Sequence, residues 1–247
     1  MSGRGKGLGL RAGALAATRR ILANFDISVD RLSKSTPARR ARFIADAEVT
    51  VLVDVGAHVG EYAGEVRRSG FAGRIESFEP LYAPYRALRA RADGDESWHC
   101  HRLALGDSQG TITMHVAANE VSSSALAMLP RHLEGDPRSG YLRTEEAPAT
   151  TLDDLDLAGP SDVLYVKIDV QGYERRVLAG ALRTLGQASL VELELSLVHL
   201  YEDTPLAAEM IDHMAGLGFE PIWLERGFCD ERTGRMLQVD AIFARCP

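Results

Sequence analysis

Short apolar runs alternate with helical patterns along most of the chain. The apolar runs predict strands at residues 49–54, 74–79, 98–104, 111–117, 162–168, 189–195, 219–225 and 237–244. Apolar positions that recur every three to four residues predict helices at 59–69, 81–92, 172–185 and 204–217. The pattern is lost over residues 118–160, which contain four prolines, and there we expect an irregular loop or lid over a ligand site.

This alternation of strands and helices is typical of a parallel sheet that has helices on both faces. The last two strands are joined by R-G-F-C-D-E-R-T-G-R, which leaves no room for a crossover helix. Strands with so short a connection pair antiparallel, so the final strand should run against its neighbour. The sequence therefore predicts an α/β fold with a doubly wound, mostly parallel sheet and an antiparallel last strand.

The turn after the first predicted strand carries the first chemical signal. The segment V-D-V-G-A-H-V-G, residues 53–60, takes the chain from an apolar strand into a helical pattern. Its glycines lack a Cβ and so let the backbone approach a ligand closely. Glu79 ends the second strand, where a carboxylate can accept hydrogen bonds from both ribose hydroxyls of a nucleotide. Together these features predict a site for an adenosine-containing cofactor.

The spacing of the glycines narrows the choice of cofactor. A dinucleotide site would read G-x-G-x-x-G, whereas here Ala57 and His58 lie between Gly56 and Gly60, and the turn has no P-loop lysine. A pyrophosphate therefore has no evident seat, and S-adenosylmethionine, which has a ribose and no phosphate, fits better. Asp54 at the strand end suits the cationic amino-acid tail of that cofactor. The alternative is that the glycines only permit tight packing of strand and helix.

Composition indicates one globular domain. The chain has 247 residues, of which 45% are hydrophobic and 26% charged. No apolar run approaches the roughly 20 residues that span a bilayer, and the N-terminus lacks the apolar core of a secretory signal. Three scattered cysteines indicate neither a disulfide framework nor a metal site. We therefore expect a cytoplasmic protein.

The net charge of −7 is unevenly distributed. Residues 1–42 hold ten basic and two acidic residues, hence +8, which leaves −15 for the rest of the chain. We expect a basic N-terminal arm at 1–45, with an amphipathic helix at 14–25, and a folded domain at 46–247. The arm could cap the site, contact an anionic substrate or lie on an anionic membrane, but we favour a solvated helix. The acidic remainder would repel nucleic acid, so we expect no nucleic-acid partner.

A second segment, Y-V-K-I-D-V-Q-G-Y-E-R-R-V-L-A-G at residues 165–180, carries a lysine and an aspartate on one face of a strand and then passes into a helix. Together with V-D-V-G-A-H-V-G and E-S-F-E-P, it resembles the FkbM family of S-adenosylmethionine-dependent methyltransferases. The resemblance runs from about residue 51 to residue 243 and includes A-L-G-D, S-S-S, T-L-D-D and V-D-A-I-F. Two positions depart from the family, which often has Asn where His58 stands and Glu where Gln171 stands.

The resemblance implies a class I methyltransferase domain with a Rossmann-like, seven-stranded sheet. Because known members methylate hydroxyl groups, it also implies O-methylation of a sugar, a glycolipid or a polyketide-type natural product. The acceptor would then be a small or glycosylated molecule. Two alternatives belong to other classes. An NAD-type oxidoreductase lacks its phosphate-binding turn here, and the intact Asp54, Glu79 and Asp169 argue against a non-catalytic cofactor-binding protein.

Ligands of open α/β sheets bind outside the carboxyl ends of the strands. We expect cofactor contacts from Asp54, Gly56, Ala57, His58, Gly60, Glu79, Pro80, Leu105, Asp169 and Val170. Glu79 should hold the ribose hydroxyls, and Leu105 should lie against the adenine because A-L-G-D follows the third strand.

A hydroxyl acceptor also needs a group that takes its proton. Asp169, Glu194 and His199 are the candidates near the carboxyl edge of adjacent strands. Glu192 shares a strand face with Glu194, and one of the two could pair with Lys167. We expect Lys167 to be the partner of a buried acid. These acids have no recognisable metal-ligand spacing, so no metal is expected.

Overall fold

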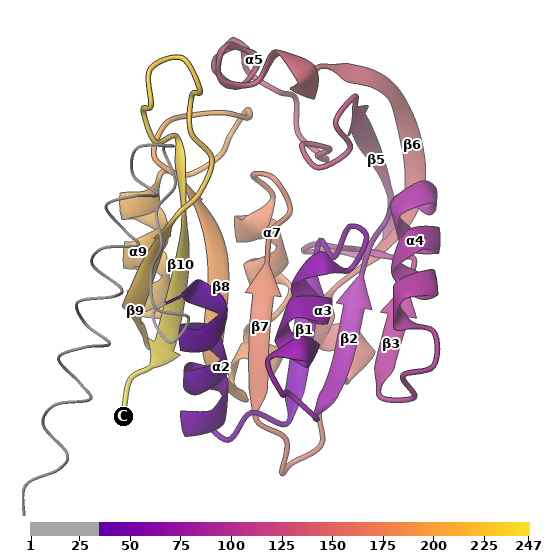
Figure 1. Cartoon of the computed structure of the whole chain (residues 1–247), viewed down its shortest axis with the longest axis vertical. Helices are drawn as coiled ribbons and strands as arrows, with labels where there is room; N and C mark the ends of the chain where they lie inside the picture. The colour runs from indigo at the N-terminus through magenta and orange to yellow at the C-terminus, as the bar shows by residue number, and fades with distance from the viewer. Residues whose placement is uncertain (1–34) are drawn as a thin grey trace, which may run out of the picture. The chain divides into compact units, whose positions relative to one another are not determined.

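The computed structural model describes residues 35–247, and the compact unit that carries the cofactor motifs comprises Arg40–Pro247. Its main sheet has seven strands in the order β3-β2-β1-β7-β8-β10-β9 (Figure 1). The strands are β1 (Val51–Val55), β2 (Arg74–Phe78), β3 (Trp98–His101), β7 (Leu164–Ile168), β8 (Ala188–Ser196), β9 (Phe219–Arg226) and β10 (Gln238–Arg245).

The direction of the strands confirms the predicted fold class. The strands β3, β2, β1, β7 and β8 pair parallel, and β10 pairs antiparallel with both β8 and β9. All five residues of β1 and of β7 are buried, as expected for central strands covered on both faces. The domain is therefore α/β, with a mostly parallel seven-stranded sheet and an antiparallel last strand.

Two apolar cores flank the sheet, because successive side chains of a strand point to opposite faces. The helices are α2 (Thr36–Asp46), α3 (Glu61–Arg68), α4 (Tyr82–Ala92), α7 (Glu174–Ala179), α8 (Leu182–Leu185) and α9 (Ala207–Gly216). One core joins Leu52 and Ile75 of the sheet to side chains of α3 and α4. The other joins Val53 and Val166 to side chains of α7, α8 and α9.

The segment expected to be irregular contains a strand that the apolar pattern does not predict. A second sheet has the order β4-β6-β5, and its strands are β4 (Ala104–Leu105), β5 (Gly110–Ala117) and β6 (Tyr141–Thr150). The strand β6 reads Y-L-R-T-E-E-A-P-A-T, and most of its side chains are exposed or half-buried. It therefore lacks the apolar run that identifies a buried strand. The rest of the segment includes α5 (Pro130–Gly135), a 3-10 turn (Pro137–Ser139) and α6 (Leu152–Leu155).

Two predicted elements are divided in the structure. The helix expected at 172–185 is two helices, α7 and α8, which are separated at Gly180. A Cβ on Gly180 would lie 2.0 Å from the carbonyl oxygen of Gly106, so the chain turns where it meets another backbone. The strand expected at 98–104 is divided between β3 of the main sheet and β4 of the small sheet.

The folded domain includes part of the segment assigned to the arm. The compact unit begins at Arg40, earlier than the expected start at residue 46, and Ile44 is buried in the core beside α3. The helix expected at 14–25 lies outside the described residues. Across residues 35–247, no helix combines the length and the apolar character that crossing a membrane requires.

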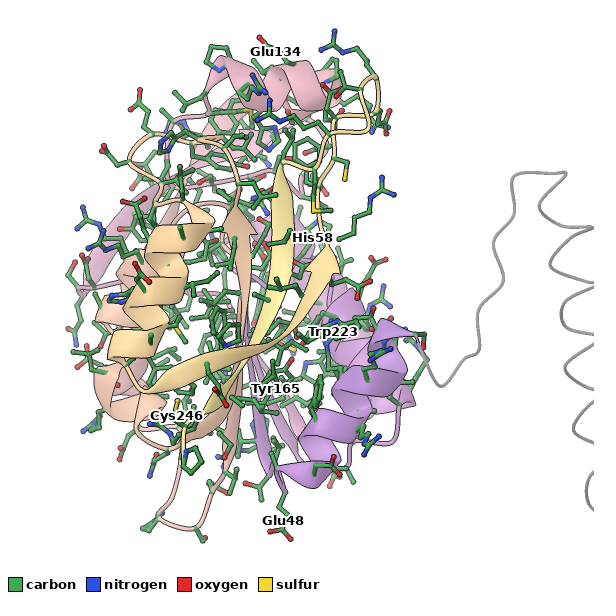
Figure 2. All side chains as sticks on the ribbon, turned by 90° about the vertical axis from the view of Figure 1, so that its left-hand side faces the viewer. Glu48, His58, Glu134, Tyr165, Trp223 and Cys246 are labelled. Atoms are coloured by element: carbon green, nitrogen blue, oxygen red, sulfur yellow. The ribbon has the colours of Figure 1, made fainter. Side chains whose placement is uncertain are left out.

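The chain direction fixes where a ligand would meet the sheet. Figure 2 shows Glu48, before β1, and His58, after it, toward opposite ends of the sheet. Glu134, in α5, lies at the same end as His58 (Figure 2). The carboxyl ends of the parallel strands therefore face the segment that contains α5, which is the expected position of a ligand site.

Candidate active site

A row of charged side chains crosses the middle of the sheet. Asp54 of β1 and Lys167 of β7 are register partners, and Asp54 is fully buried. The Lys167 Nζ lies 3.4 Å from Asp54 Oδ1 and 3.5 Å from Asp169 Oδ2. It also donates to the carbonyl oxygen of Gly56 at 3.1 Å. The expected pairing of Lys167 with a buried acid is therefore present, and it involves Asp54 together with Asp169.

The ion pairs determine the charge state of the lysine. Burial lowers the pKa of Lys167, but Asp169 and Asp54 outweigh burial and the net pKa is raised. Lys167 is therefore an ammonium group whose charge two acids already neutralise.

Both glycines of the turn after β1 are required by packing. Gly56 has a φ of 76°, and a Cβ there would lie 1.8 Å from the carbonyl oxygen of Asp169. A Cβ on Gly60, whose φ is 78°, would lie 2.7 Å from Leu88 Cδ1 of α4. Tight packing, the alternative raised from the sequence, therefore accounts for both glycines, and Gly56 in addition lines the cavity described next.

A cavity of about 230 Å³ opens above the carboxyl ends of β1, β2 and β7. Most of the residues expected to contact the cofactor line this cavity, namely Gly56, Ala57, His58, Glu79, Pro80, Asp169 and Val170. Lys167 lines it as well, whereas Asp54 and Gly60 do not.

A smaller apolar hollow adjoins this cavity and contains Leu105. Its wall includes Phe78, Leu105, Ile112 and Tyr173, and its volume is about 30 Å³. The two spaces share lining residues, among them Pro80, so they are adjacent. An apolar slot beside a carboxylate suits a flat aromatic base such as adenine.

Glu79 lines the larger cavity next to Pro80, which borders both spaces. Its Oε2 accepts the backbone N–H of His58 at 2.9 Å, and its Oε1 accepts that of Leu81 at 2.8 Å. Burial raises the pKa of Glu79 to about 7, although these two hydrogen bonds oppose the shift. Each carboxylate oxygen has two acceptor sites, so each can still accept a ribose hydroxyl. The donors and acceptors present at this wall therefore fit the ribose of S-adenosylmethionine.

Asp169 is a partly exposed acid of the cavity wall. Its side chain is 38% exposed and lines the cavity directly after β7. One oxygen faces Lys167, and Oδ1 accepts from Gln171 Nε2 at 2.9 Å. The carboxylate is thus held from two sides while part of it faces open space.

The structure does not bring the other two proton-acceptor candidates to the cavity wall. Glu194 Oε2 accepts from Gln171 Nε2 at 2.9 Å and from Gln238 Nε2 at 2.6 Å, so Glu194 lies behind Gln171. Burial, with the charges of Asp169 and Asp240, raises the pKa of Glu194 well above its ordinary value. His199 is exposed, and its Nδ1 lies 3.0 Å from the carbonyl oxygen of Thr204.

Several cavity residues were not found from the sequence. The sequence marks Gln171 only as a departure from the family pattern, and it does not show that Gln171 bridges two acids. Glu120, Val121 and Ser123 reach the cavity from the segment expected to form a lid, which supports that expectation. Tyr62 follows Gly60 in the first turn of α3, and helical spacing from the glycine turn is the signal that would have identified it.

Glu192 has a different partner from the one considered. Arg40 donates to its two carboxylate oxygens at 2.9 and 2.8 Å, and Tyr62 Oη donates to Oε2 at 2.6 Å. The hydroxyl of Tyr165 is also bonded to Glu192. Glu192 therefore pairs with Arg40 rather than with Lys167.

No group of three or more His, Cys, Asp or Glu in residues 35–247 has an arrangement that could hold a metal ion.

The sheet order, the cavity at its carboxyl edge and the acid at the end of β2 define a class I methyltransferase domain. The sequence matches the family described as methyltransferase FkbM domain over residues 54–221, so the chain belongs to the FkbM methyltransferases. Its methyl donor is S-adenosylmethionine. Among curated proteins, none matches the sequence significantly.

Solved methyltransferases resemble the structure at low sequence identity. An rRNA methylase from Streptococcus thermophilus has a TM-score of 0.49 at 10% identity, over 88% of this chain and 100% of that chain. Magnesium protoporphyrin IX methyltransferase from Synechocystis gives 0.45 at 10% identity, over 85% and 78%. The 1,6-didemethyltoxoflavin-N1-methyltransferase from Burkholderia thailandensis gives 0.46 at 10%, over 100% and 92%. Likeness at this level carries no inference about the acceptor.

Proposed function

We propose that the protein is an O-methyltransferase that moves the methyl group of S-adenosylmethionine to a hydroxyl of a sugar, glycolipid or polyketide-type molecule. The observation that carries this proposal is Asp169, a partly exposed carboxylate beside the cofactor cavity that Lys167 and Gln171 hold in place. The hydroxyl acceptor is what the family resemblance implies, and a positioned carboxylate is what a hydroxyl acceptor needs.

The proposed cofactor site follows the chemistry of the cavity walls. Glu79 accepts the ribose hydroxyls, and Leu105 packs against the adenine in the apolar hollow. The turn from Gly56 passes under the methionine part. Asp54 is fully buried and paired, so it acts on the methionine tail only through the placement of Lys167.

The cofactor supplies an electrophilic methyl group when it is bound, so the chain must align the acceptor and remove its proton. Alignment can lower the barrier by roughly 7–11 kcal/mol. In the proposed step Asp169 accepts the hydroxyl proton as the oxygen bonds to the methyl carbon. The carbon–sulfur bond breaks, and its electron pair stays on the sulfur of S-adenosylhomocysteine. A positioned base of this kind adds about 10²–10⁴-fold in rate.

Charge at the cavity supports an acceptor without phosphate groups. Glu61 and Glu120 line the cavity together with Asp169. Lys167 is the one Lys or Arg among the described lining residues, and it already contacts two acids. Burial lowers the pKa of His58, which keeps its imidazole neutral near pH 7. A phosphate backbone would meet net repulsion here, so we propose a small-molecule acceptor and no nucleic acid.

The test is a methyl-transfer assay with labelled S-adenosylmethionine against methyl glycosides, glycolipids, macrolactone alcohols and RNA, followed by mass spectrometry. Methylation of a hydroxyl in one of the first three classes supports the proposal, and transfer to RNA alone overturns it. Calorimetric titration with S-adenosylhomocysteine and with NAD addresses the alternatives. Tight binding of NAD alone would favour an oxidoreductase, and cofactor binding without transfer to any acceptor would favour a binding protein.

A further inference from the structure

We propose that Gln171 is a positioning residue for methyl transfer, which holds the Asp169 carboxylate toward the acceptor and links it through Tyr201 to the segment above the cavity. The proposal rests on the proposed role of Asp169 as proton acceptor. It assigns this role to a neutral amide, which in this chain can donate to two acids at once.

The amide nitrogen of Gln171 bridges the two acids. Its Nε2 lies 2.9 Å from Asp169 Oδ1 and 2.9 Å from Glu194 Oε2. An amide nitrogen carries two hydrogens, so each carboxylate receives one. A glutamate at this position would provide no donor in its ionised form and would add a third negative charge.

The other end of the amide is held by a buried phenol. Tyr201 is fully buried, and its Oη donates to Gln171 Oε1 at 2.8 Å. Carboxylates on one side and a donating phenol on the other allow only one orientation of the amide. Tyr201 therefore keeps the Gln171 N–H groups directed at the acids.

Gln171 and Tyr201 also contact the segment above the cavity. The backbone carbonyl of Gln171 accepts from Ser124 Oγ at 2.7 Å, and Tyr201 Oη lies 3.0 Å from Nε2 of His132 in α5. Gln171 also has a φ of 56°, a left-handed conformation that costs a non-glycine residue about 1 kcal/mol or more. Glycine would adopt this backbone conformation without that cost. The hydrogen bonds of the Gln171 side chain can offset the cost.

Asp169 is consequently clamped between a cation and an amide. Lys167 faces Oδ2 and Gln171 faces Oδ1, so rotation of the carboxylate would break one contact or the other. The ionisable groups that interact with Asp169 come from the turn after β1, from β1, β7, β8, β10 and α7, and from the segment after β8. They are His58, Asp54, Lys167, Glu194, Asp240, Glu174 and Tyr201. Most of them are acids, so the Asp169 carboxylate depends on the few donors and cations that contact it.

The test replaces the amide in two ways and measures methyl transfer to the most active acceptor of the assay panel above. Gln171→Glu exchanges the donor for a carboxylate, and Gln171→Met removes both polar ends. We expect turnover to fall about 10- to 100-fold in both variants, as for a small misplacement of a reacting group. We also expect the pH profile of turnover to move to higher pH, because a carboxylate that loses a hydrogen-bond donor is less stabilised in its ionised form. Gln187→Glu, at an exposed glutamine before β8, is the matched control and should change neither quantity.

Tyr201→Phe tests the link to the segment above the cavity. It leaves the Gln171 amide in place without its phenol partner, so turnover should fall about 3- to 10-fold, with a pH shift of the same sign. Tyr82→Phe is the control, because Tyr82 lies in α4, is 52% exposed and lines neither of the two spaces at the sheet edge. Affinity for S-adenosylhomocysteine, measured by calorimetry, should stay within about twofold in all these variants, since none of the replaced groups is assigned to the cofactor.

The outcomes separate this inference from the proposed function. If Asp169→Asn keeps full turnover, Asp169 is not the proton acceptor and both proposals fail. If Asp169→Asn is impaired while the Gln171 variants keep normal turnover and an unshifted pH profile, only the positioning role is overturned. A uniform loss at every pH with weaker cofactor affinity would show that Gln171 is merely structural. Should Gln171→Glu fail to fold, Gln171→Met and Tyr201→Phe decide the question.

Discussion

Two clusters of polar side chains lie side by side on one face of the sheet, and they differ in what their partners leave open. In the first, Arg40 and two tyrosines surround the carboxylate of Glu192, whose side chain is 7% exposed. In the second, Lys167 and Gln171 hold Asp169, which remains 38% exposed at the cavity. A carboxylate whose partners saturate it stabilises the fold, whereas one that still faces open space is available to a ligand.

Tyr62 contacts both clusters. The Arg40 guanidinium lies 4.5 Å and the Lys167 Nζ 5.3 Å from its ring centroid. Its hydroxyl completes the shell of Glu192, and the residue also lines the cavity. Tyr62 therefore belongs to the cluster around Glu192 and also forms part of the cavity wall beside Asp169. The comparison predicts that substitutions in the first cluster change stability and those in the second change turnover.

The largest effect is expected in the second cluster, which we call the open cluster because Asp169 still faces the cavity. Asp169→Asn keeps the size and part of the hydrogen bonding of the side chain but removes its charge. If Asp169 receives the proton, turnover should fall by about 10²–10⁴-fold while S-adenosylhomocysteine affinity and melting temperature stay nearly unchanged. Steady-state kinetics and calorimetry provide the measurement. An equal loss of cofactor affinity would assign Asp169 to orienting the cofactor instead.

The next largest effect is expected in the first cluster, which we call the closed cluster because its partners surround Glu192. Arg40→Met leaves Glu192 buried without its cation, which should lower the free energy of unfolding by about 3–5 kcal/mol. The turnover of the folded fraction should not change, because Arg40 is outside the cavity. Arg42→Met is the control on the same helix, since the pair of Arg42 with Asp46 is 80% and 67% exposed and contributes little. Denaturant titration measures the free energy. A stable Arg40→Met protein with low turnover would contradict the assignment of Arg40 and Glu192 to stability.

The same contrast explains what the sequence could reveal. The open cluster follows from local motifs, because strands that end in V-D-V-G, E-S-F-E-P and K-I-D-V place their polar ends at one edge of a parallel sheet. The closed cluster joins Arg40 to Glu192, 152 positions apart, and no local pattern connects them. Glu194 was likewise placed on the correct strand, yet only the structure shows that Gln171 lies between it and the cavity.

The lid was the least predictable part of the fold. Its strand β6 is a largely exposed strand of a small sheet, so its stability comes from pairing with β5 rather than from an apolar face of its own. Residues that reach the cavity from this segment, such as Glu120 and Ser123, have no sequence signal beyond their position in a long connection.

A smaller effect is expected on cofactor affinity, which should depend on pH through Glu79 and not through Asp169. Burial raises the pKa of Glu79 to about 7. In the proposed cofactor site, ribose hydroxyls donate to the ionised form of this carboxylate. Protonation below pH 7 removes that acceptor, so affinity for S-adenosylhomocysteine should weaken as pH falls from 8 to 6, by up to about tenfold per unit below the pKa. Calorimetry across this range measures the effect.

Glu79→Gln is the control for this pH dependence, because it keeps the size of the side chain and cannot ionise. The variant should bind more weakly at pH 8, by about 1.5–3 kcal/mol at most, and its affinity should no longer vary with pH. An unchanged dissociation constant at pH 8 would remove Glu79 from the ribose site. A pH dependence that persists in Glu79→Gln would point to Glu174 or Asp240, because burial raises the pKa of each to about 7 as well.

The smallest effect concerns the basic segment before the domain. Residues 2–34 include seven basic and two acidic residues and lie outside the cofactor motifs. We propose that they assist the acceptor, so deleting 2–34 should raise the Michaelis constant for the acceptor several-fold and leave cofactor affinity unchanged. Deleting 2–42 removes Arg40 in addition, and it should lower the free energy of unfolding as Arg40→Met does. Comparison of the two deletions thus distinguishes a change in the Michaelis constant for the acceptor from a loss of stability at the closed cluster. If the shorter deletion already lowers melting temperature and both affinities, the segment belongs to the folded unit. If it abolishes only binding to phosphatidylserine vesicles, the segment serves a membrane surface.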